Sequence, residues 1–354
     1  MYIKTSFLLR AVALALPLTL AALPPVSQAQ TSAKKSQASQ KKATPAAVVP
    51  TPFPADAMQH IQELNADTST PDLREGAKGP AVLRAQVMLD RNWFSVGEID
   101  GSFGSNMMRA VNAFQQARSL PVTGRMDAAT WGALGQQAPA LATYTLTEKD
   151  VAGPYIAIPD DPVLQSELPS LAYQDMSEAL AERFHMSPKL LAALNKGRNP
   201  QVGQAIVVTD VGRAVAMPKA TSLRIDKSDK MLYILGEGGK VMGAMPISIG
   251  SSQDPLPLGM LQITARAPNP DFMYNPSLLR NAKTDKKVKL PPGPNSPVGV
   301  MWLSLTKEHW GIHGTAEPSQ MARVETNGCI RLTNWDVVRL STVVDKGVNV
   351  EVQS

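Results

Sequence analysis

Short apolar runs recur between residues 213 and 354, and their spacing constrains the fold of this chain more than any other feature. Seven runs, separated mostly by turns that contain Gly or Asp, cover residues 222–225, 231–235, 241–249, 260–264, 298–305, 310–312 and 348–352. Runs of this length with turns between them are typical of an all-β sandwich or barrel. We therefore predict a mainly-β sandwich for residues 213–354, with one helix over residues 334–344.

The segment over residues 72–135 has a different pattern. Apolar residues at helical spacing predict one helix over 82–89 and another over 107–114, and Asp127 is placed to cap a third. Turn sequences lie between the helices. This run of residues, which includes Ile99-Asp-Gly-Ser-Phe-Gly104, resembles the three-helix peptidoglycan-binding domain. The resemblance implies binding to the cell wall; the alternative is a helical spacer that has lost its ligand groove.

A second small module is predicted over residues 171–211. Two short helices, one through Met176 to Phe184 and one over residues 190–194, precede a strand over 204–208. The sequence from Ala179 to Gln204 is similar to part of a LysM repeat, a module that binds glycans containing N-acetylglucosamine, although the opening strand and turn of that family are missing. We predict that His185 lies at a solvated helix end, and that residues 136–170, rich in Pro and Ala, are a linker.

The first 29 residues predict a secretory signal peptide. A short basic region with Lys4 and Arg10 precedes an apolar run over 11–23, and small residues stand three and one before a cut after Ala29. Residues 30–70 are predicted to be a flexible linker, because 30–55 hold too few large apolar residues to offset the entropy of ordering. The mature protein is therefore expected in the periplasm or cell wall, with no membrane span after signal removal.

The chain contains one cysteine, Cys329. Outside the cytoplasm thiols tend to be oxidised, and a single cysteine cannot form a disulfide within its own chain. Such a residue is either a reactive thiol or a small buried apolar group. A reactive thiol needs a base to reach the thiolate state near neutral pH. His313, sixteen positions earlier at the end of a strand-like run, is the best candidate.

The sequence around both residues supports the reactive thiol. His313-Gly-Thr315, Gly328-Cys-Ile-Arg-Leu332, Asn334, Asp336 and an upstream Pro291-Pro-Gly-Pro-Asn295 together resemble the L,D-transpeptidase catalytic domain of the YkuD type, over about residues 220–353. That family has a β-sandwich core and acts on the stem peptides of peptidoglycan. The resemblance implies a thioester between Cys329 and a tetrapeptide stem, which is then transferred to an amine.

The resemblance also implies roles for individual residues. Cys329 is the nucleophile, His313 is the base, and the carbonyl of Gly314 orients the imidazole. On an extended segment Arg331 faces the same way as the thiol, so it is placed to bind a substrate carboxylate and to favour the thiolate. Donors to an oxyanion, or contacts to substrate, are expected from Gly328, Asn327, Thr326 and Tyr274, the last on a long insertion over residues 267–297. A disordered tip is the alternative for that insertion.

One departure from the family stands next to the cysteine. Thr326-Asn327-Gly328-Cys329 replaces the common Ser-His-Gly-Cys, so any role of a second histidine is absent. Two other functions are alternatives to the transferase, one with the same catalytic residues and one without catalysis. A hydrolase would form the same thioester with water as acceptor, and a wall-binding protein without catalysis would use only the upstream modules.

The expected partners are peptidoglycan stem peptides and glycan, with an outer-membrane lipoprotein as one possible acceptor. A formal net charge of +5 suits approach to an anionic polymer. No nucleic acid is expected, because the basic residues are scattered. We expect no cofactor and no metal, because no set of His, Cys and carboxylate residues has the spacing of metal ligands.

Overall fold

The computed structural model describes residues 58–135, 139–212, 214–250, 256–279, 282–325 and 328–354. All of them belong to one unit that begins at Ala47. The predicted signal peptide lies outside the described residues, as does the predicted linker up to residue 57. No helix among the described residues is long and apolar enough to cross a membrane.

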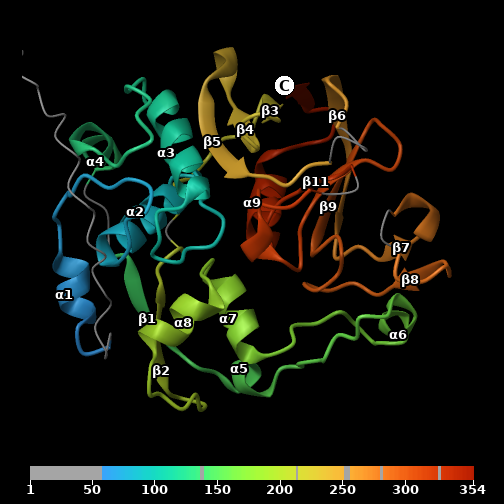
Figure 1. Ribbon diagram of the computed structural model, residues 1–354, viewed down its shortest axis with the longest axis horizontal. Helices are drawn as coiled ribbons and strands as arrows, with labels where there is room; N and C mark the ends of the chain where they lie inside the picture. The colour runs from blue at the N-terminus through green and yellow to red at the C-terminus, as the bar shows by residue number, and fades with distance from the viewer. Residues whose placement is uncertain (1–57, 136–138, 213, 251–255, 280–281, 326–327) are drawn as a thin grey trace, which may run out of the picture. The chain divides into compact units, whose positions relative to one another are not determined.

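Eight strands of the C-terminal region pair into one mixed sheet. Its order is β11-β10-β9-β6-β12-β3-β4-β5, and Figure 1 shows several of these strands around helix α9. The strands are β3 (Ser222–Asp226), β4 (Met231–Leu235), β5 (Val241–Pro246), β6 (Gly259–Pro268), β9 (Met301–Leu305), β10 (Gly311–His313), β11 (Ile330–Arg331) and β12 (Asn349–Gln353). The seven predicted runs each contribute one of these strands, whereas β11, two residues long, was not predicted.

The prediction of a mainly-β domain is confirmed, but its strands form one curled sheet, because one long strand joins the two halves. Strand β6 pairs with β12 through its first residues and with β9 through its last ones, and its register shifts between Ile263 and Ala265. A shift of this kind bends a strand and strengthens its twist. Beyond β5, Ser248 forms an isolated bridge with Arg331 of β11, at the other edge. The region is therefore a β-rich half-barrel whose edges meet at one bridge.

Helix α9 (Asn334–Val343) covers the core of this half-barrel. The Thr333 side chain caps it by accepting a hydrogen bond from the backbone N–H of Asp336. Its apolar side places Val337, Leu340 and Val343 in one buried cluster with residues of the sheet. This packing agrees with the predicted helix and places its first turn beside the ends of β9 and β10.

Three helices form the first module, as the spacing predicted. They are α2 (Pro80–Arg91), α3 (Ser105–Ala117) and α4 (Ala128–Leu134). Asp127 caps α4 by accepting a hydrogen bond from the backbone N–H of Thr130. Gln86 of α2 holds the intervening turn, since its side chain donates to Asp100 and accepts from the backbone N–H of Gly101.

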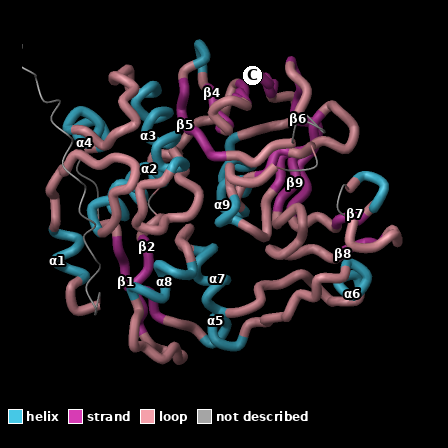
Figure 2. Tube along the Cα trace, viewed as in Figure 1, coloured by secondary structure: helices cyan, strands magenta, loops and turns pink. Residues whose placement is uncertain are grey.

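The predicted linkers contain regular structure. Helix α1 (Ile61–Ala66) lies before the first module, and residues 139–170 contain β1 (Leu141–Thr145), α5 (Glu148–Ala152) and α6 (Pro162–Ser166). Strand β1 pairs antiparallel with β2 (Ala205–Thr209). The two strands lie side by side in Figure 2, so β1 belongs with the second module. Between these strands lie α7 (Met176–Arg183) and α8 (Pro188–Leu194). The linker prediction was wrong for β1, whose partner strand lies 60 residues further along the chain.

The insertion over residues 267–297 carries a small hairpin. Strand β7 (Phe272–Tyr274) pairs with β8 (Val288–Leu290). Tyr274 is only 6% exposed, packs in a cluster with Leu171 and Leu290, and its hydroxyl accepts a hydrogen bond from the backbone N–H of Lys283. The ring is therefore held within the hairpin, and the contact of Tyr274 with a substrate stays a prediction.

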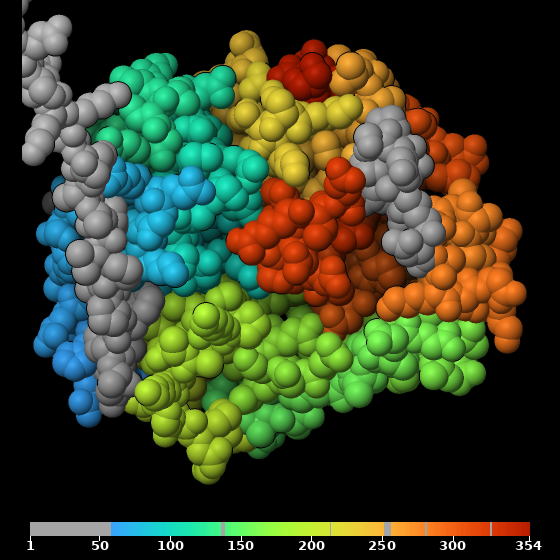
Figure 3. All heavy atoms as spheres, in the orientation of Figure 1, coloured from blue at the N-terminus to red at the C-terminus, as the bar shows by residue number. Residues whose placement is uncertain are grey.

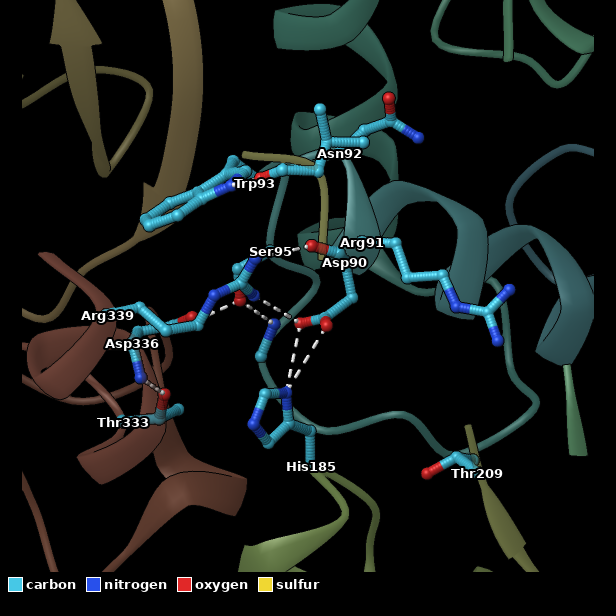
Figure 4. A network of polar contacts seen from close by, with 12 residues as sticks. Asp90, Arg91, Asn92, Trp93, Ser95, His185, Thr209, Thr333, Asp336 and Arg339 are labelled. Atoms are coloured by element: carbon cyan, nitrogen blue, oxygen red, sulfur yellow. Dashed lines mark hydrogen bonds and ion pairs between the residues drawn. The ribbon is translucent and has the colours of Figure 1, made fainter. Parts of the chain in front are cut away.

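A buried polar network joins the helical module, the second module and α9 (Figure 4). Asp90 of α2 is fully buried and lies 3.2 Å from both His185 and Arg339. Ser95 donates a hydrogen bond of 2.6 Å to Asp336 of α9. His185 was predicted to be solvated, but its side chain is only 13% exposed because it pairs with the buried carboxylate of Asp90.

Candidate active site

The parallel pairing of β10 with β11 brings the predicted base and the predicted nucleophile into one region. Ile312 lies opposite Ile330, and His313 lies opposite Arg331. Paired residues share a face of a sheet, as do residues two apart on a strand. Cys329 directly precedes β11, and its thiol contacts the backbone of Gly311, which agrees with this register. Cys329, Arg331 and His313 thus lie on neighbouring strands, at the edge where the half-barrel closes.

His313 is held in a fixed orientation. It is 4% exposed, and its Nδ1 lies 2.7 Å from the carbonyl oxygen of Gly314. Its ring stacks on Trp302 of β9, with centroids 5.2 Å apart and planes 12° from parallel. A carbonyl oxygen only accepts, so Nδ1 carries the proton of the neutral ring. The lone pair of the imidazole is therefore on Nε2, the atom that a base would use.

Two effects keep this imidazole neutral. Burial lowers the pKa of His313 to about 3, and the nearby charge of Arg331 acts in the same direction. The hydrogen bond to Gly314 opposes both but is weaker. A base that is neutral throughout the physiological range is ready to accept a proton without first losing one.

The thiol of Cys329 is also neutral at rest. Burial raises its pKa, while the backbone of Gly311 and the charge of Arg331 lower it. Sγ lies 3.6 Å from the carbonyl oxygen of His309. The pKa directions therefore favour a thiol and an imidazole rather than a preformed ion pair.

Arg331 connects the thiol to the surface. Its guanidinium interacts with the charges of Glu317 and Cys329, and burial lowers the pKa of Arg331. Its Nε is buried and has no hydrogen-bond partner among the described residues. A buried donor without an acceptor is costly. A carboxylate of a bound molecule would supply the missing acceptor.

Asn334, at the start of α9, fixes the backbone that follows His313. Its Oδ1 accepts hydrogen bonds of 3.2 Å from the backbone N–H groups of Val300 and Thr315. A Cβ at Gly314 would lie 2.1 Å from this oxygen, and one at Gly299 would lie 2.0 Å from it. Glycine is therefore required at both positions. The sequence resemblance included Asn334 but did not indicate this role.

The remaining predicted residues lie around the cysteine. Gly328 has φ +111°, and a Cβ there would approach the Trp310 ring to 3.2 Å, so this position also requires glycine. Thr326 and Asn327 lie outside the described residues. Sequence reasoning missed Trp302 as the stacking partner of His313. No group of three or more metal-ligating side chains occurs among the residues that were described.

Comparison with known families agrees with this geometry. Residues 220–352 match the family model of the "L,D-transpeptidase catalytic domain" (YkuD), and residues 78–134 match that of the "Putative peptidoglycan binding domain". The chain is an enzyme of the L,D-transpeptidase family. Its catalytic domain and its peptidoglycan-binding domain imply action on peptidoglycan, outside the cytoplasm.

Individual relatives show the extent of the similarity. Two proteins named "Putative L,D-transpeptidase YkuD", from Bacillus licheniformis and Bacillus subtilis, are each 28% identical to the enzyme. The matches cover 49% and 51% of this chain, and 92% and 98% of the relatives. A crystal structure of the L,D-transpeptidase (residues 123–326) from Xylanimonas cellulosilytica is 17% identical over 80% of this chain and 98% of that one, with a TM-score of 0.35.

Proposed function

We propose that this L,D-transpeptidase forms a thioester between Cys329 and a peptidoglycan tetrapeptide stem, and then transfers the stem to an amine. The observation that carries the proposal is the pairing of β10 with β11, which gathers Cys329, Arg331 and a neutral His313 with its lone pair on Nε2. These are a nucleophile, an anion-binding group and a base.

The first half-reaction follows from those groups. Nε2 of His313 accepts the thiol proton as Sγ attacks the carbonyl carbon of the amide before the terminal D-alanine. The resulting oxyanion is stabilised by N–H groups near Gly328, and Thr326 and Asn327 are proposed to assist. The carbon–nitrogen bond then breaks. The leaving amine of D-alanine takes the proton from Nε2, and the stem remains on Sγ as a thioester.

The second half-reaction reverses these roles. An acceptor amine attacks the thioester carbon and gives a proton to Nε2 of His313. The carbon–sulfur bond breaks, and the sulfur regains the proton. A side-chain amine of diaminopimelate would give a cross-link, and a lysine of an outer-membrane lipoprotein would give an anchored protein. With water as acceptor, the same steps would describe a hydrolase.

Targeting to the wall completes the proposal. We propose export by the N-terminal signal peptide to the periplasm, and glycan contact by the peptidoglycan-binding domain and the LysM-like segment. The family match over residues 78–134 supports a wall-directed role for the first of these two modules.

The test is incubation of the purified enzyme with tetrapeptide muropeptides, followed by mass spectrometry of the products. Transfer predicts cross-linked dimers and free D-alanine, and also a covalent adduct on Cys329 that is absent from Cys329→Ala. Shortened stems without dimers would identify a hydrolase instead. If neither a product nor an adduct forms, the result favours a wall-binding protein without catalysis.

A further inference from the structure

A cleft of about 870 Å³ lies where three parts of the enzyme meet. Its walls come from the peptidoglycan-binding domain between residues 78 and 107, from α7 and α8 of the second module, and from the catalytic domain at residues 316–319, Arg323 and Trp335. Figure 3 shows these three segments meeting on the visible face. The volume falls within the range of sites that enclose a small organic ligand.

The charge of the cleft is opposite to that of the chain. Five carboxyl groups line it, against three basic side chains, whereas the whole chain has a formal net charge of +5. The five acidic residues are Glu98, Asp100, Glu178, Glu182 and Glu317. An excess of carboxylates in a concave site attracts a cationic group more strongly than the same charges on an open surface.

Among the described residues, Glu98 and Glu317 are the two acidic residues of the cleft whose side chains make no hydrogen bond, and of these only Glu98 is partly buried. Asp100, in contrast, bonds Gln86 and the backbone of Ser102. Burial raises the pKa of Glu98 to about 7. The negative charge of Asp100 contributes to this rise, and the positive charge of Arg323 opposes it. A bound cationic molecule would stabilise the ionised carboxylate.

The cleft is connected to the catalytic residues in two ways. Its wall at residues 316–319 follows directly on His313-Gly-Thr315 along the chain. Glu317 in that wall interacts with the charge of Arg331, which in turn interacts with Cys329. A ligand in the cleft would therefore lie next to the group that we propose for binding the donor stem.

We propose that this cleft binds the acceptor, a peptidoglycan stem peptide that carries a free side-chain amine, and that Glu98 contributes to the binding of this peptide. The inference rests on the proposed function, because it assumes transfer to an amine. It adds that the peptidoglycan-binding domain contributes directly to acceptor binding, in addition to attaching the enzyme to the wall.

The test separates the two half-reactions in the full-length enzyme. Acylation of Cys329 by a tetrapeptide muropeptide is measured by mass spectrometry without acceptor, and dimer formation is then measured against the concentration of a tripeptide muropeptide, which can accept but not donate. Glu98→Gln is expected to raise the KM for the acceptor about tenfold, the effect of losing a charged hydrogen bond, with acylation as in the wild type. Glu351→Gln, an exposed carboxylate in β12, is the matched control.

An unchanged acceptor KM in Glu98→Gln would overturn the inference even if the enzyme forms dimers. If the wild type is not acylated, the proposed function fails, and the cleft is tested by binding alone. Calorimetric titration of the tripeptide muropeptide into Cys329→Ala is then compared with Cys329→Ala/Glu98→Gln. Weaker binding in the double variant supports the site; equal binding, or none in either, excludes it.

Discussion

Nδ2 of Asn334 donates a hydrogen bond of 3.0 Å to Oε2 of Glu182, a residue 152 positions earlier on α7. The same amide donates to the carbonyl of Pro294, and its oxygen holds the backbone N–H of Thr315 next to Gly314. Since Gly314 accepts the Nδ1 proton of His313, the second module contacts the base through one intervening side chain. A chain of hydrogen bonds therefore connects α7 to the backbone that holds the imidazole.

Glu182→Gln tests the electrostatic part of this relationship. Burial raises the pKa of Glu182 to about 7 from its ordinary 4.5. Between these values the folded protein keeps a proton that the unfolded chain has lost, so stability falls as pH rises. Glutamine cannot ionise but can still accept from Asn334. We expect the variant to gain up to about 3 kcal/mol relative to the wild type between pH 4 and pH 8, measured by urea unfolding.

Two outcomes of that experiment are informative. Glu351→Gln, which changes an exposed carboxylate, should show no such trend. A difference between Glu182→Gln and the wild type that does not vary with pH would mean that the pKa of this carboxyl is the same in the folded and the unfolded protein.

Gly314→Ala tests the contact between Asn334 and the backbone beside the base. The new Cβ would lie 2.1 Å from Oδ1 of Asn334 and 3.2 Å from Cα of Gly299. Neither atom belongs to a flexible chain end, so the helix and the strand must separate. We expect a loss of about 1–3 kcal/mol in the free energy of unfolding and a lower kcat.

The matched control is Gly132→Ala in α4, where nothing lies within 4 Å of the new Cβ. Alanine in a helix should stabilise that variant by about 0.5–1 kcal/mol. Thermal denaturation of both variants gives the comparison. Equal stability of the two would contradict the crowding at Gly314.

His313→Asn tests whether the base is neutral when folded. The pKa of His313 is lowered to about 3 from 6.5. Between these values the unfolded chain binds a proton that the folded protein does not, so stability falls as pH falls. From pH 6.5 to pH 5 this residue should account for about 2 kcal/mol of the loss. Urea unfolding at both pH values should show a smaller loss in His313→Asn than in the wild type.

His309→Asn provides the comparison, because the His309 side chain is 70% exposed. It should retain the pH dependence of the wild type. If His313→Asn also retains it, the pKa of His313 is not lowered in the folded protein, and burial does not hold the imidazole neutral below pH 6.5.

Sequence patterns predicted the elements better than their arrangement. Strands β3, β4 and β12 were predicted within one or two residues. Burial alternates along β3 and β12, and β4 is a continuous buried apolar run, so each leaves a local signal. The curl of the sheet depends on the shifted register of β6 and on the bridge from Ser248 to Arg331, which connects residues 83 positions apart. No local pattern carries that information.

In the candidate site, too, the sequence indicated the residues but not the contacts that hold them. The motif around His313 and Cys329 indicated which residues meet, since the family resemblance covers both. It did not indicate what holds them, because the partners are distant in sequence: Trp302 stacks on His313 from β9, and Glu182 contacts Asn334 from another module. The prediction that His185 is solvated was wrong for a similar reason, because its partner Asp90 lies 95 positions away in the sequence.

Arg331→Lys tests the proposed contact with the donor carboxylate. A guanidinium presents several N–H donors in a planar fork and binds a carboxylate through two parallel hydrogen bonds, whereas an ammonium acts as a point charge. Lysine keeps the charge near Cys329 but removes Nε, the donor that lacks a partner among the described residues. We expect a rise of about tenfold in the KM for a tetrapeptide donor, with a smaller change in the rate of acylation at saturation.

The donor itself supplies the control for this variant. If Arg331 binds the carboxylate of the terminal D-alanine, then amidating that carboxylate removes the interaction from the wild type as well. The wild type and Arg331→Lys should then acylate with similar KM values, so that the two changes are not additive. Should Arg331→Lys weaken the amidated donor as much as the free acid, the guanidinium acts on another group, such as the thiol of Cys329, whose pKa its charge lowers.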